Sequence, residues 1–308
     1  MFDEKFDEAR FHDEDAARAH LESLRWPNGW ICPHCGATGR ICRITSQTGE
    51  KGKGARPGLL FCGDCRKQFS VTVGTVFEDS KVPLHKWVLA THLLCSSKKG
   101  ISSHQLHRIL GVSYKTAWFM THRIREAMKP DNPEMLGGNS PVEADETFVG
   151  RKPGRKKHKG TGHKNAVLSL VERGGQVRSF HVPSVNAETL RPYLKRNITP
   201  NAHLMTDDAG QYFLLGPEFA KHDVVVHSQG EYVRDNVYTN TAEGFFSILK
   251  RGIYGVYQHV SALHLHRYTT EFDFRYNHRA KLGFDDTQRE AQALKGIVGK
   301  RLTYRRTD

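Results

Sequence analysis

Three acidic residues, Asp145, Asp207 and Glu243, each stand at the end of a predicted strand or the start of a predicted helix, and Lys250 follows two helical turns after Glu243. Two divalent metal ions about 4 Å apart need several oxygen ligands that converge on one point. Mg²⁺ usually takes a few protein carboxylates together with substrate phosphate and water. The arrangement therefore predicts a two-metal site for phosphoryl transfer.

The segments around these acids predict the elements that position them. Residues 142–150 alternate as a strand that carries Asp145, and a second strand, 203–207, ends at Asp207 because Ala209-Gly210 stops it. A helix over 240–252 carries Glu243 on a face different from its apolar stripe, since residues four and seven apart line up. Ser247 and Lys250 share the face of Glu243, whereas the stripe consists of Ala242, Phe245, Phe246 and Leu249.

The two aspartates also have simpler interpretations. Asp145 could be an exposed strand residue, and Glu143 or Glu146 could replace it as a metal ligand. Asp207 and Asp208 could only make an Asx turn. The order strand, strand, helix favours one shared site over separate structural roles.

Four of the six cysteines form two Cys-x-x-Cys pairs separated by 26 residues: Cys32, Cys35, Cys62 and Cys65. Two such knuckles can bring four thiolates to a tetrahedral Zn²⁺, which leaves no open position for a substrate. Because Cys42 and Cys95 stand alone, the pattern favours metal binding over a disulfide framework or redox-active thiols. The sequence predicts one structural zinc in a ribbon over 26–78, with His34 solvated.

Helical periodicity over 79–129 predicts a DNA-binding segment. A helix at 102–110, a break at Gly111 and a helix at 114–128 have helix-turn-helix proportions. The second helix would enter the major groove and present Tyr114, Lys115, His122 and Arg123. An ordinary helical hairpin explains the pattern as well, but its position after a zinc ribbon favours DNA binding.

The charge distribution favours a polyanionic partner. The first 26 residues carry eight acids against four bases, so the net charge of +13 leaves about +17 on the remainder. A basic surface kept for solubility is the alternative. Residues 151–164 hold seven Lys or Arg and no acid, which predicts a phosphate-contacting arm beside Asp145 or a disordered, solvated loop: Arg151, Lys152, Arg155, Lys156 and Lys157.

The chain divides into segments typical of a multidomain α+β and α/β protein. Further strands are predicted at 165–173, 177–183 and 223–227, with helices at 187–197 and 261–277. No apolar run approaches the roughly 20 residues of a membrane span, and the first residues are acidic, unlike a leader. We expect a cytoplasmic, nucleoid-associated protein without membrane contact. Its expected segments are a helix in 1–25, the ribbon 26–78, the helical segment 79–129, a linker 130–141, a catalytic domain 142–285 and a basic C-terminal tail 286–308.

Several blocks of the chain resemble bacterial insertion-sequence transposases. VEADETFVGRK, LMTDDAGQY and NTAEGFFSILKRGIYGVYQHVSALHLHRYTTEFDFRYNHR, preceded by the cysteine pairs, are similar to the zinc-ribbon DDE group of ISXO type, which is related to eukaryotic Merlin transposases. The resemblance covers nearly the whole chain. It implies an RNase H-like catalytic domain, a mixed sheet flanked by helices, with the first Asp on the first strand, the second after the fourth strand and the Glu on a following helix.

The resemblance also implies roles for individual residues. Two Mg²⁺ (or Mn²⁺) ions would bind to Asp145, Asp207 and Glu243. Lys250 and the adjacent Arg251 would contact DNA. Some relatives carry Asn or His in place of the third acid, and Glu243 could alternatively complete a capping box with Asn240. Tyr238 stands where many relatives have His.

The implied activity is that of a DNA transposase. Such an enzyme binds the terminal inverted repeats of its insertion sequence, cleaves at the element ends and joins the 3′-OH ends to target DNA. Cutting two ends in one reaction implies at least a homodimer on DNA. Two alternatives differ in class: a catalytically inert, transposase-derived DNA-binding regulator, which the intact triad disfavours, and an RNase H-like nuclease or resolvase.

Overall fold

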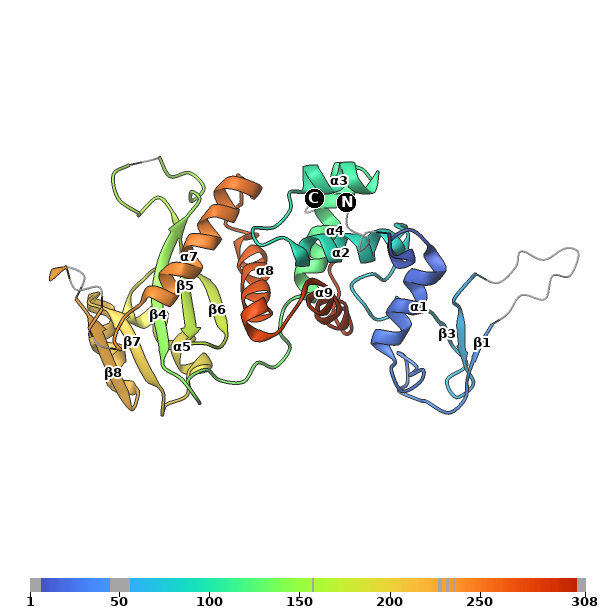
Figure 1. Ribbon diagram of the computed structural model, residues 1–308, viewed down its shortest axis with the longest axis horizontal. Coiled ribbons are helices and arrows are strands. Elements are labelled where there is room, and N and C mark those ends of the chain that lie inside the picture. Colours follow the sequence, from blue (N-terminus) through green and yellow to red (C-terminus); the bar gives the residue numbers. More distant parts are fainter. Residues whose placement is uncertain are drawn as a thin grey trace, which may run out of the picture. The chain divides into compact units, whose positions relative to one another are not determined.

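The chain folds into two compact units (Figure 1). The computed structural model describes residues 7–44, 56–156, 158–226, 229–230, 233–234 and 236–303. One unit comprises Met1–Ser97, Ser103–Met128 and Asp286–Asp308, and the other comprises Lys98–Ser102 and Lys129–Asp285. In the second unit Gly100 lies so close to Tyr257 that an added Cβ would be 1.8 Å from its hydroxyl oxygen, which explains the glycine.

Helices form most of the first unit. Its core packs α2 (Leu84–Ser96) against α9 (Asp286–Lys295), and α1 (Glu14–Arg25) and α4 (Tyr114–Ala127) contact both of these helices. A 3-10 helix, Ala9–Phe11, precedes α1. Asp13 caps α1 by accepting a hydrogen bond from the Ala16 amide at 2.7 Å, so the helix predicted there is confirmed. Within the described residues, no helix is long and apolar enough to cross a membrane.

The two helices predicted on either side of Gly111 are confirmed. α3 (Ser103–Leu110) packs against α4 across a three-residue turn in which Gly111 has a φ of +60°. The Ser113 hydroxyl caps α4 by accepting a hydrogen bond from the Thr116 amide at 3.1 Å. The helices bury apolar residues at the expected spacing: Leu106, Leu110, Ala117, Met120 and Ile124.

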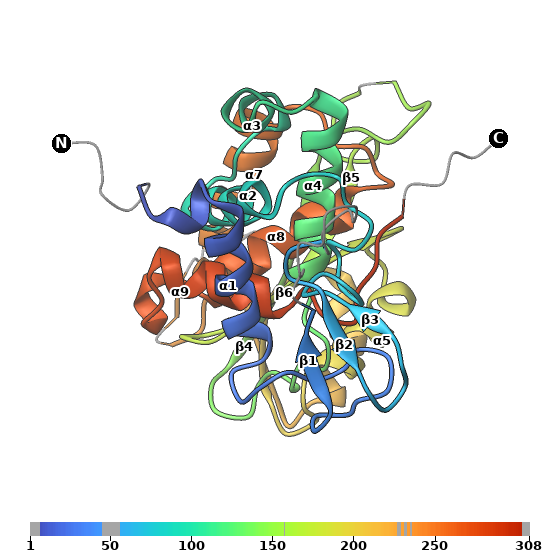
Figure 2. The same ribbon diagram turned by 90° about the vertical axis from the view of Figure 1, so that its right-hand side faces the viewer.

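The segment that contains the cysteine pairs forms a small antiparallel sheet (Figure 2). Its order is β1 (Ile41–Arg43), β2 (Leu60–Cys62), β3 (Gln68–Phe69). β3 ends at Phe69, and Val71 is buried in the turn that follows it.

The C-terminal residues differ from the tail that we expected. Residues 286–295 form α9, and the segment after it is hydrogen-bonded to the same unit: the Ile297 carbonyl accepts from the Val76 amide at 3.1 Å, and the Gly299 amide donates to the Gly74 carbonyl at 2.9 Å. The buried face of α9 includes Arg289 and Glu290. Charged residues on that face hide the apolar periodicity from which a packed helix is predicted.

A five-stranded mixed sheet forms the second unit, in the order β6-β5-β4-β7-β8 (Figure 1). β4 pairs antiparallel with β5 and parallel with β7; β5 and β6 are antiparallel, and β7 and β8 parallel. The strands are β4 (Val142–Val149), β5 (Asn165–Glu172), β6 (Val177–Val182), β7 (His203–Asp207) and β8 (Lys221–Val225). All five strands were predicted, and β8 begins two residues before the predicted range.

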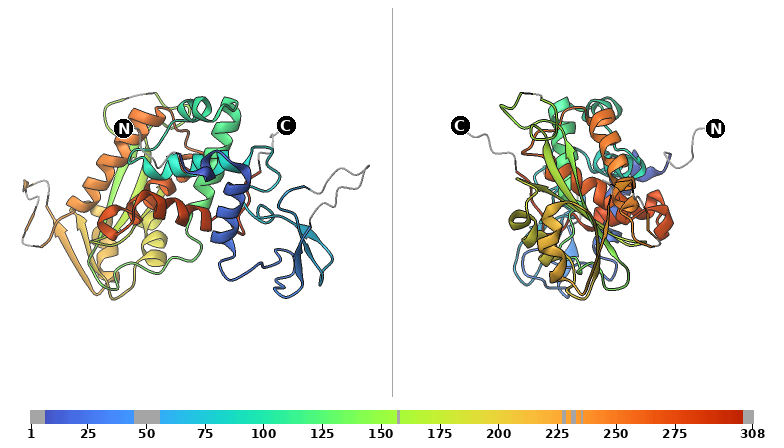
Figure 3. Two further views of the ribbon diagram at one scale, coloured as in Figure 1. Left: turned by 45° about the vertical axis from the view of Figure 1, so that its right-hand side comes forward. Right: turned by 90° about the vertical axis from the view of Figure 1, so that its left-hand side faces the viewer.

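Helices cover both faces of this sheet (Figure 3). One face packs on α5 (Ala187–Asn197) and α6 (Gly210–Leu215) through a core that includes Val142, Ala144 and Leu204. The other face packs on α7 (Asn240–Gly252) and α8 (Leu265–Asn277) through a core that includes Val149 and Phe245. A 3-10 helix Gly216–Glu218 follows α6, a π-helical turn Ile253–Tyr257 follows α7, and a 3-10 helix Ala280–Leu282 follows α8.

Three features of this unit escaped the sequence patterns. β7 ends at Asp207 as predicted, but the short helix α6 that begins at Gly210 was not predicted. α8 begins at Leu265 rather than at residue 261. The expected linker 130–141 is partly packed: Leu136 is buried, and its amide donates to the Asn197 carbonyl at 2.7 Å.

The first unit depends on a buried carboxylate, which yields a testable prediction. Glu290 of α9 is fully buried and accepts from the His92 ring at 2.9 Å, with Arg10 at 3.3 Å and His20 at 3.5 Å. Burial raises the pKa of Glu290, but hydrogen bonds from His20 and His92 and the Arg10 charge hold it below its usual range. The stabilisation is therefore present above about pH 4.5 and is lost as the pH falls through the lowered pKa.

Replacing Glu290 by Gln should lower the stability of this unit by about 3 kcal/mol at neutral pH, because the buried Arg10 guanidinium loses a counter-charge and the His92 ring loses a charged hydrogen-bond partner. The matched change Asp286→Asn removes a half-exposed carboxylate paired with Arg289 and should cost less than about 1 kcal/mol. Urea midpoints of the zinc-loaded proteins measure both effects. Equal midpoint shifts for the two variants would contradict the role of Glu290.

Candidate functional site

The two cysteine pairs converge on one point. The ligand atoms of Cys32, Cys35, Cys62 and Cys65 all lie within 4.8 Å of one another. The Sγ atoms of Cys32 and Cys65 are 3.7 Å apart, as are those of Cys35 and Cys62. A tetrahedron with Zn–S bonds of about 2.3 Å has sulfur–sulfur edges of about 3.8 Å. The four thiolates are the donor set of a structural Zn²⁺, and two of their sulfur–sulfur distances already match such a tetrahedron.

Two backbone turns shape this zinc site. In the first, the Gly36 amide donates to the Cys32 carbonyl at 2.9 Å; in the second, the Cys62 amide donates to the Lys67 carbonyl at 3.0 Å. The residue after each pair has a left-handed backbone, with φ of +77° at Gly36 and +56° at Arg66. His34 is exposed, 3.4 Å from the Gln68 carbonyl and outside the ligand group, as expected.

The sheet brings the two aspartates to the same level on neighbouring strands. β4 and β7 pair in parallel as Val142 with Leu204 and Glu143 with Met205, an offset of 62 residues (204 minus 142). The same offset carries Asp145 to Asp207. Adjacent strands lie about 4.8 Å apart, and level residues of parallel strands share a face. Asp145 and Asp207 therefore lie together at the end of β7.

Side-chain alternation shows which face these aspartates occupy. Val142 and Ala144 belong to the core beneath α5, whereas Val149 belongs to the core beneath α7. Successive strand residues point to opposite faces. Asp145 has the parity of Val149, so it faces the layer of α7, the helix that carries Glu243.

Glu146 lies beside the two aspartates but belongs to the other face. Its carboxylate accepts hydrogen bonds from the Tyr212 hydroxyl at 2.6 Å and the Gln211 amide at 3.3 Å. Burial, together with the negative charges of Asp145 and Asp207, raises the pKa of Glu146 to about 7. The negative charges of both aspartates act on this one carboxyl group, as expected from the parallel pairing of β4 with β7.

Glu143 fixes the start of α7. It is fully buried, and it accepts from Arg173 Nε at 2.6 Å, from the Thr241 hydroxyl at 2.8 Å and from the Ala242 amide at 2.9 Å. Arg173 also donates to the Tyr238 carbonyl at 2.7 Å, and its guanidinium lies 3.5 Å from the centroid of the Tyr238 ring. The alternative in which Glu143 is a metal ligand is disfavoured, because its oxygens are committed to this network.

Arg173 and its network escaped the sequence reasoning. A lone arginine after a strand carries no motif, and only the buried position of Glu143 inside VEADETFVG could have signalled a required cationic partner. The Tyr238 ring covers the arginine that holds the start of α7.

The helix α7 presents its polar residues as predicted. Glu243, Lys250 and Arg251 are exposed and Ser247 is half-buried, whereas the predicted apolar stripe is buried. The helix begins at Asn240, so Thr239 and not Asn240 is its N-cap residue, and the Thr239 side chain makes no capping hydrogen bond. Asp207 does make the Asx turn, since its Oδ1 accepts from the Ala209 amide at 3.1 Å.

Two of the three predicted acids, Asp145 and Asp207, are placed to bind a divalent cation, and Glu243 is not. Mg²⁺ is typically held by one or two carboxylates together with substrate phosphates, which Asp145 and Asp207 can supply. Across the described ranges, the four cysteines are the one group of three or more His, Cys, Asp or Glu residues whose ligand atoms converge. The structure thus brings Asp145 and Asp207 together and does not bring Glu243 into a three-carboxylate cluster.

Of the four residues of α4 that we predicted to contact DNA, two are exposed and two are buried. Tyr114 and Lys115 are exposed at the start of α4. The predictions for the other two residues were wrong: His122 is fully buried, and Arg123 is 9% exposed, with its guanidinium donating to the carbonyls of Glu78 and Leu302. All residues of α4 from 120 to 125 are buried, so this part of the helix is enclosed on every side and offers no exposed face to a groove.

The basic loop between β4 and β5 is exposed. Arg151, Arg155 and Lys156 are exposed, Lys152 is half-buried, and Lys157 lies outside the described residues. The Lys152 amide donates to the His163 carbonyl at 2.8 Å, which closes the base of the loop beside the end of β4.

Comparisons with known proteins find matches to both parts of the chain. A family described as "ISXO2-like transposase domain" matches residues 135–277, and one described as "Transposase zinc-ribbon domain" matches residues 12–68. An "Uncharacterized protein in transposable element ISH50" of Halobacterium salinarum is 32% identical over 260 residues, 78% of this chain and 83% of that protein. The alignment with a solved structure, "Crystal structure of a pre-cleavage Mos1 transpososome", covers 63% of this chain and 74% of the other chain at 11% identity. Its TM-score is 0.19, which is too low to show a shared fold.

The sheet order, with helices on both faces, and the four-cysteine site define a zinc-ribbon protein with an RNase H-like unit. Counted within that unit, the strand order is 3-2-1-4-5, with Asp145 on the first strand and Asp207 at the end of the fourth. The chain belongs to the ISXO2-like transposase family. Both cysteine pairs lie within the matched zinc-ribbon range, and the acids and Lys250 lie within the matched transposase range.

The zinc site leads to a direct prediction. Replacing Cys35 by Ser removes one of four thiolates, so the purified protein should lose its bound zinc and part of its thermal stability, because ribbons of this size depend on the metal for folding. Cys42→Ser is the matched control: Cys42 is an exposed cysteine of the same ribbon outside the cluster. Zinc per chain, measured by atomic emission, should stay near one for Cys42→Ser. Full zinc content in Cys35→Ser would refute the assignment.

Proposed function

We propose that this transposase binds the terminal inverted repeats of its insertion sequence, cleaves at the element ends and joins the 3′-OH ends to target DNA by two-metal phosphoryl transfer. The observation that supports the proposal best is the level placement of Asp145 and Asp207 on neighbouring parallel strands, facing the layer of α7. Those two carboxylates provide the converging oxygens that phosphodiester chemistry requires.

In this proposal Asp145 and Asp207 hold the metal site, and Glu243 completes it once DNA and cations offset the repulsion among three carboxylates. Bound Mg²⁺ or Mn²⁺ supplies charge for the attacking and leaving oxygens. Glu143 holds the first turn of α7, which limits where Glu243 can lie. Lys250 is exposed seven residues further along α7, about 10 Å along its axis, where it contacts a DNA phosphate.

One site serves both chemical steps, because only the nucleophile changes. Water attacks the phosphodiester bond at the element end, and the freed 3′-OH then attacks target DNA, each in line with its leaving oxygen. The acids keep the same positions in both steps, and the contact of Lys250 with a phosphate holds the DNA strand in place. Cutting two ends in one reaction requires at least two copies of the chain on DNA.

We assign DNA binding to basic side chains and one tyrosine that lie on separate elements of the chain. Tyr114 and Lys115 at the start of α4 enter the groove, while Lys250 and Arg251 of α7 contact the backbone near the cut. The basic arm adds sequence-independent phosphate contacts from Arg151, Lys152, Arg155, Lys156 and Lys157.

Asp145→Asn and Asp207→Asn should each reduce cleavage by about 10³-fold, because the neutral amide removes a charged metal ligand from the transition state. Binding of a duplex that carries the terminal repeat should remain within about twofold. Asp208→Asn, a change within the same LMTDDAGQY motif, is the matched control and should still cleave. Cleavage is read on a labelled end duplex with Mg²⁺, and rapid cutting by either of the first two variants would rule out this site.

Lys115→Ala should weaken binding of every duplex by a similar factor and lower the slope of log affinity against log salt by about one, as expected for a single phosphate contact. Lys195→Ala serves as its control, because Lys195 is an exposed lysine of α5 paired with Glu218 at 3.0 Å. Fluorescence anisotropy over a salt series gives both slopes. Equal slopes for Lys115→Ala and the unmodified protein would remove Lys115 from the DNA interface.

A further inference from the structure

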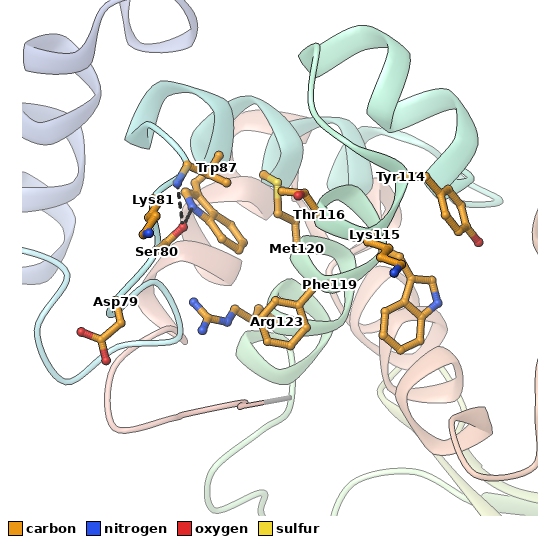
Figure 4. Close-up of a pocket in the computed structure, with 12 residues that line it drawn as sticks. Asp79, Ser80, Lys81, Trp87, Tyr114, Lys115, Thr116, Phe119, Met120 and Arg123 are labelled. Atoms are coloured by element: carbon orange, nitrogen blue, oxygen red, sulfur yellow. Dashed lines mark hydrogen bonds between the residues drawn. The ribbon is translucent and has the colours of Figure 1, made fainter. Parts of the chain in front are cut away.

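A cavity of about 720 Å³ opens in the first unit, between the start of α4 and the segment 79–82 that leads into α2 (Figure 4). Its volume falls within the roughly 300–1,000 Å³ typical of small-molecule sites. Neither the zinc site nor the acids of the second unit line it. The cavity therefore needs an explanation of its own.

Aromatic rings form the walls of this cavity, and their surroundings fix them. Trp87 is 1% exposed, packs 4.6 Å from the Phe77 ring and donates its Nε1–H to the Ser80 hydroxyl at 3.0 Å. Phe119 is half-buried and lies 4.7 Å from the guanidinium of Arg123. Arg123 in turn donates to the Glu78 and Leu302 carbonyls, so the ring beneath it has a rigid support.

Trp118 offers a second half-buried ring in the same lining. It stands one residue before Phe119 on α4 and packs against the His122 ring, with the ring centroids 4.1 Å apart. Planar rings that are held in this way are the walls on which nucleic-acid bases stack, since every base has a π-face.

Positive charge lies at the mouth of the cavity. Lys81 and Lys115 are exposed lining residues. The acid among the lining residues, Asp79, is 3.2 Å from Arg301, so its charge is compensated within the protein. A purely apolar ligand would make no favourable contact with the lysines at the mouth of the cavity. A ligand that joins an aromatic ring to an anion matches both parts.

The position of the cavity identifies a source for such a ligand. Tyr114 and Lys115 line it and also begin α4, the helix that the proposed function places on DNA. A base that leaves the stack next to this helix would meet the opening with its own phosphate close to Lys115. Unstacking costs a few kcal/mol, and it costs least at a mismatch or in a single strand.

We propose that this cavity binds one unpaired DNA base, stacked on Trp118 and Phe119, with the adjoining phosphate at Lys115. This proposal rests on the DNA binding in the proposed function, but it does not depend on the catalytic acids. It predicts that the first unit prefers DNA with an unpaired or displaced base over the matching perfect duplex.

The test uses single-stranded oligonucleotides of eight thymidines, one of which is replaced by 5-iododeoxyuridine. Ultraviolet cross-linking of the full, zinc-loaded chain, followed by peptide mass spectrometry, should place the cross-link on the peptide that contains Trp118 and Phe119. Trp118→Leu should weaken binding of the unmodified oligonucleotide about tenfold, the size of one lost base–aromatic stack. Trp118→Tyr should retain most of the affinity that Trp118→Leu loses, because tyrosine still offers an aromatic ring for stacking although its shape differs from that of tryptophan.

The control is Phe213→Leu, which removes a 65% exposed aromatic ring of α6 in the second unit and should change nothing. Zinc content and melting temperature identify any variant that fails to fold. Cross-links confined to other peptides, or unchanged affinity in Trp118→Leu, would each overturn the proposal. If the unmodified chain still cleaves end duplexes in those cases, the cavity assignment alone fails; if it binds no DNA at all, the proposed function fails as well.

Discussion

The buried ion pair between Glu143 and Arg173 is the constraint on which the catalytic unit depends. Glu143 is fully buried, and a buried carboxylate is tolerated only when a cation and further donors satisfy it. Arg173 Nε at 2.6 Å supplies the charge, and the first turn of α7 supplies two more donors. This one carboxylate therefore ties the strand that carries Asp145 to the helix that carries Glu243.

The parallel pairing of β4 with β7 adds the second element of the site. A parallel register places residues at one level, so the aspartates separated by 62 positions in the chain meet at one edge of the sheet. Their charge reaches Glu146, whose pKa rises to about 7 through burial and through the repulsion of both neighbours. The zinc site is independent of this arrangement, because two short turns bring its four thiolates together within the other unit.

Local patterns predicted much of this structure. The cysteine spacing predicted the zinc site, and the apolar stripe of α7 predicted both its ends and its exposed face, because each depends on residues close together in the chain. The failures involve charged residues that are buried. Arg289 and Glu290 hide the periodicity of α9, and Arg123 looked like a DNA contact although it holds the carbonyls of Glu78 and Leu302. Such partners lie far away in sequence, so no local pattern shows them.

The position of the metal ions tests the account most directly. A crystal structure of the protein with Mn²⁺ and a DNA end should show anomalous manganese peaks between Asp145 and Asp207, with the Glu243 carboxylate drawn toward them and the Glu143–Arg173 pair unchanged. Manganese bound at other acids, with Asp145 and Asp207 making no contact to it, would contradict the account.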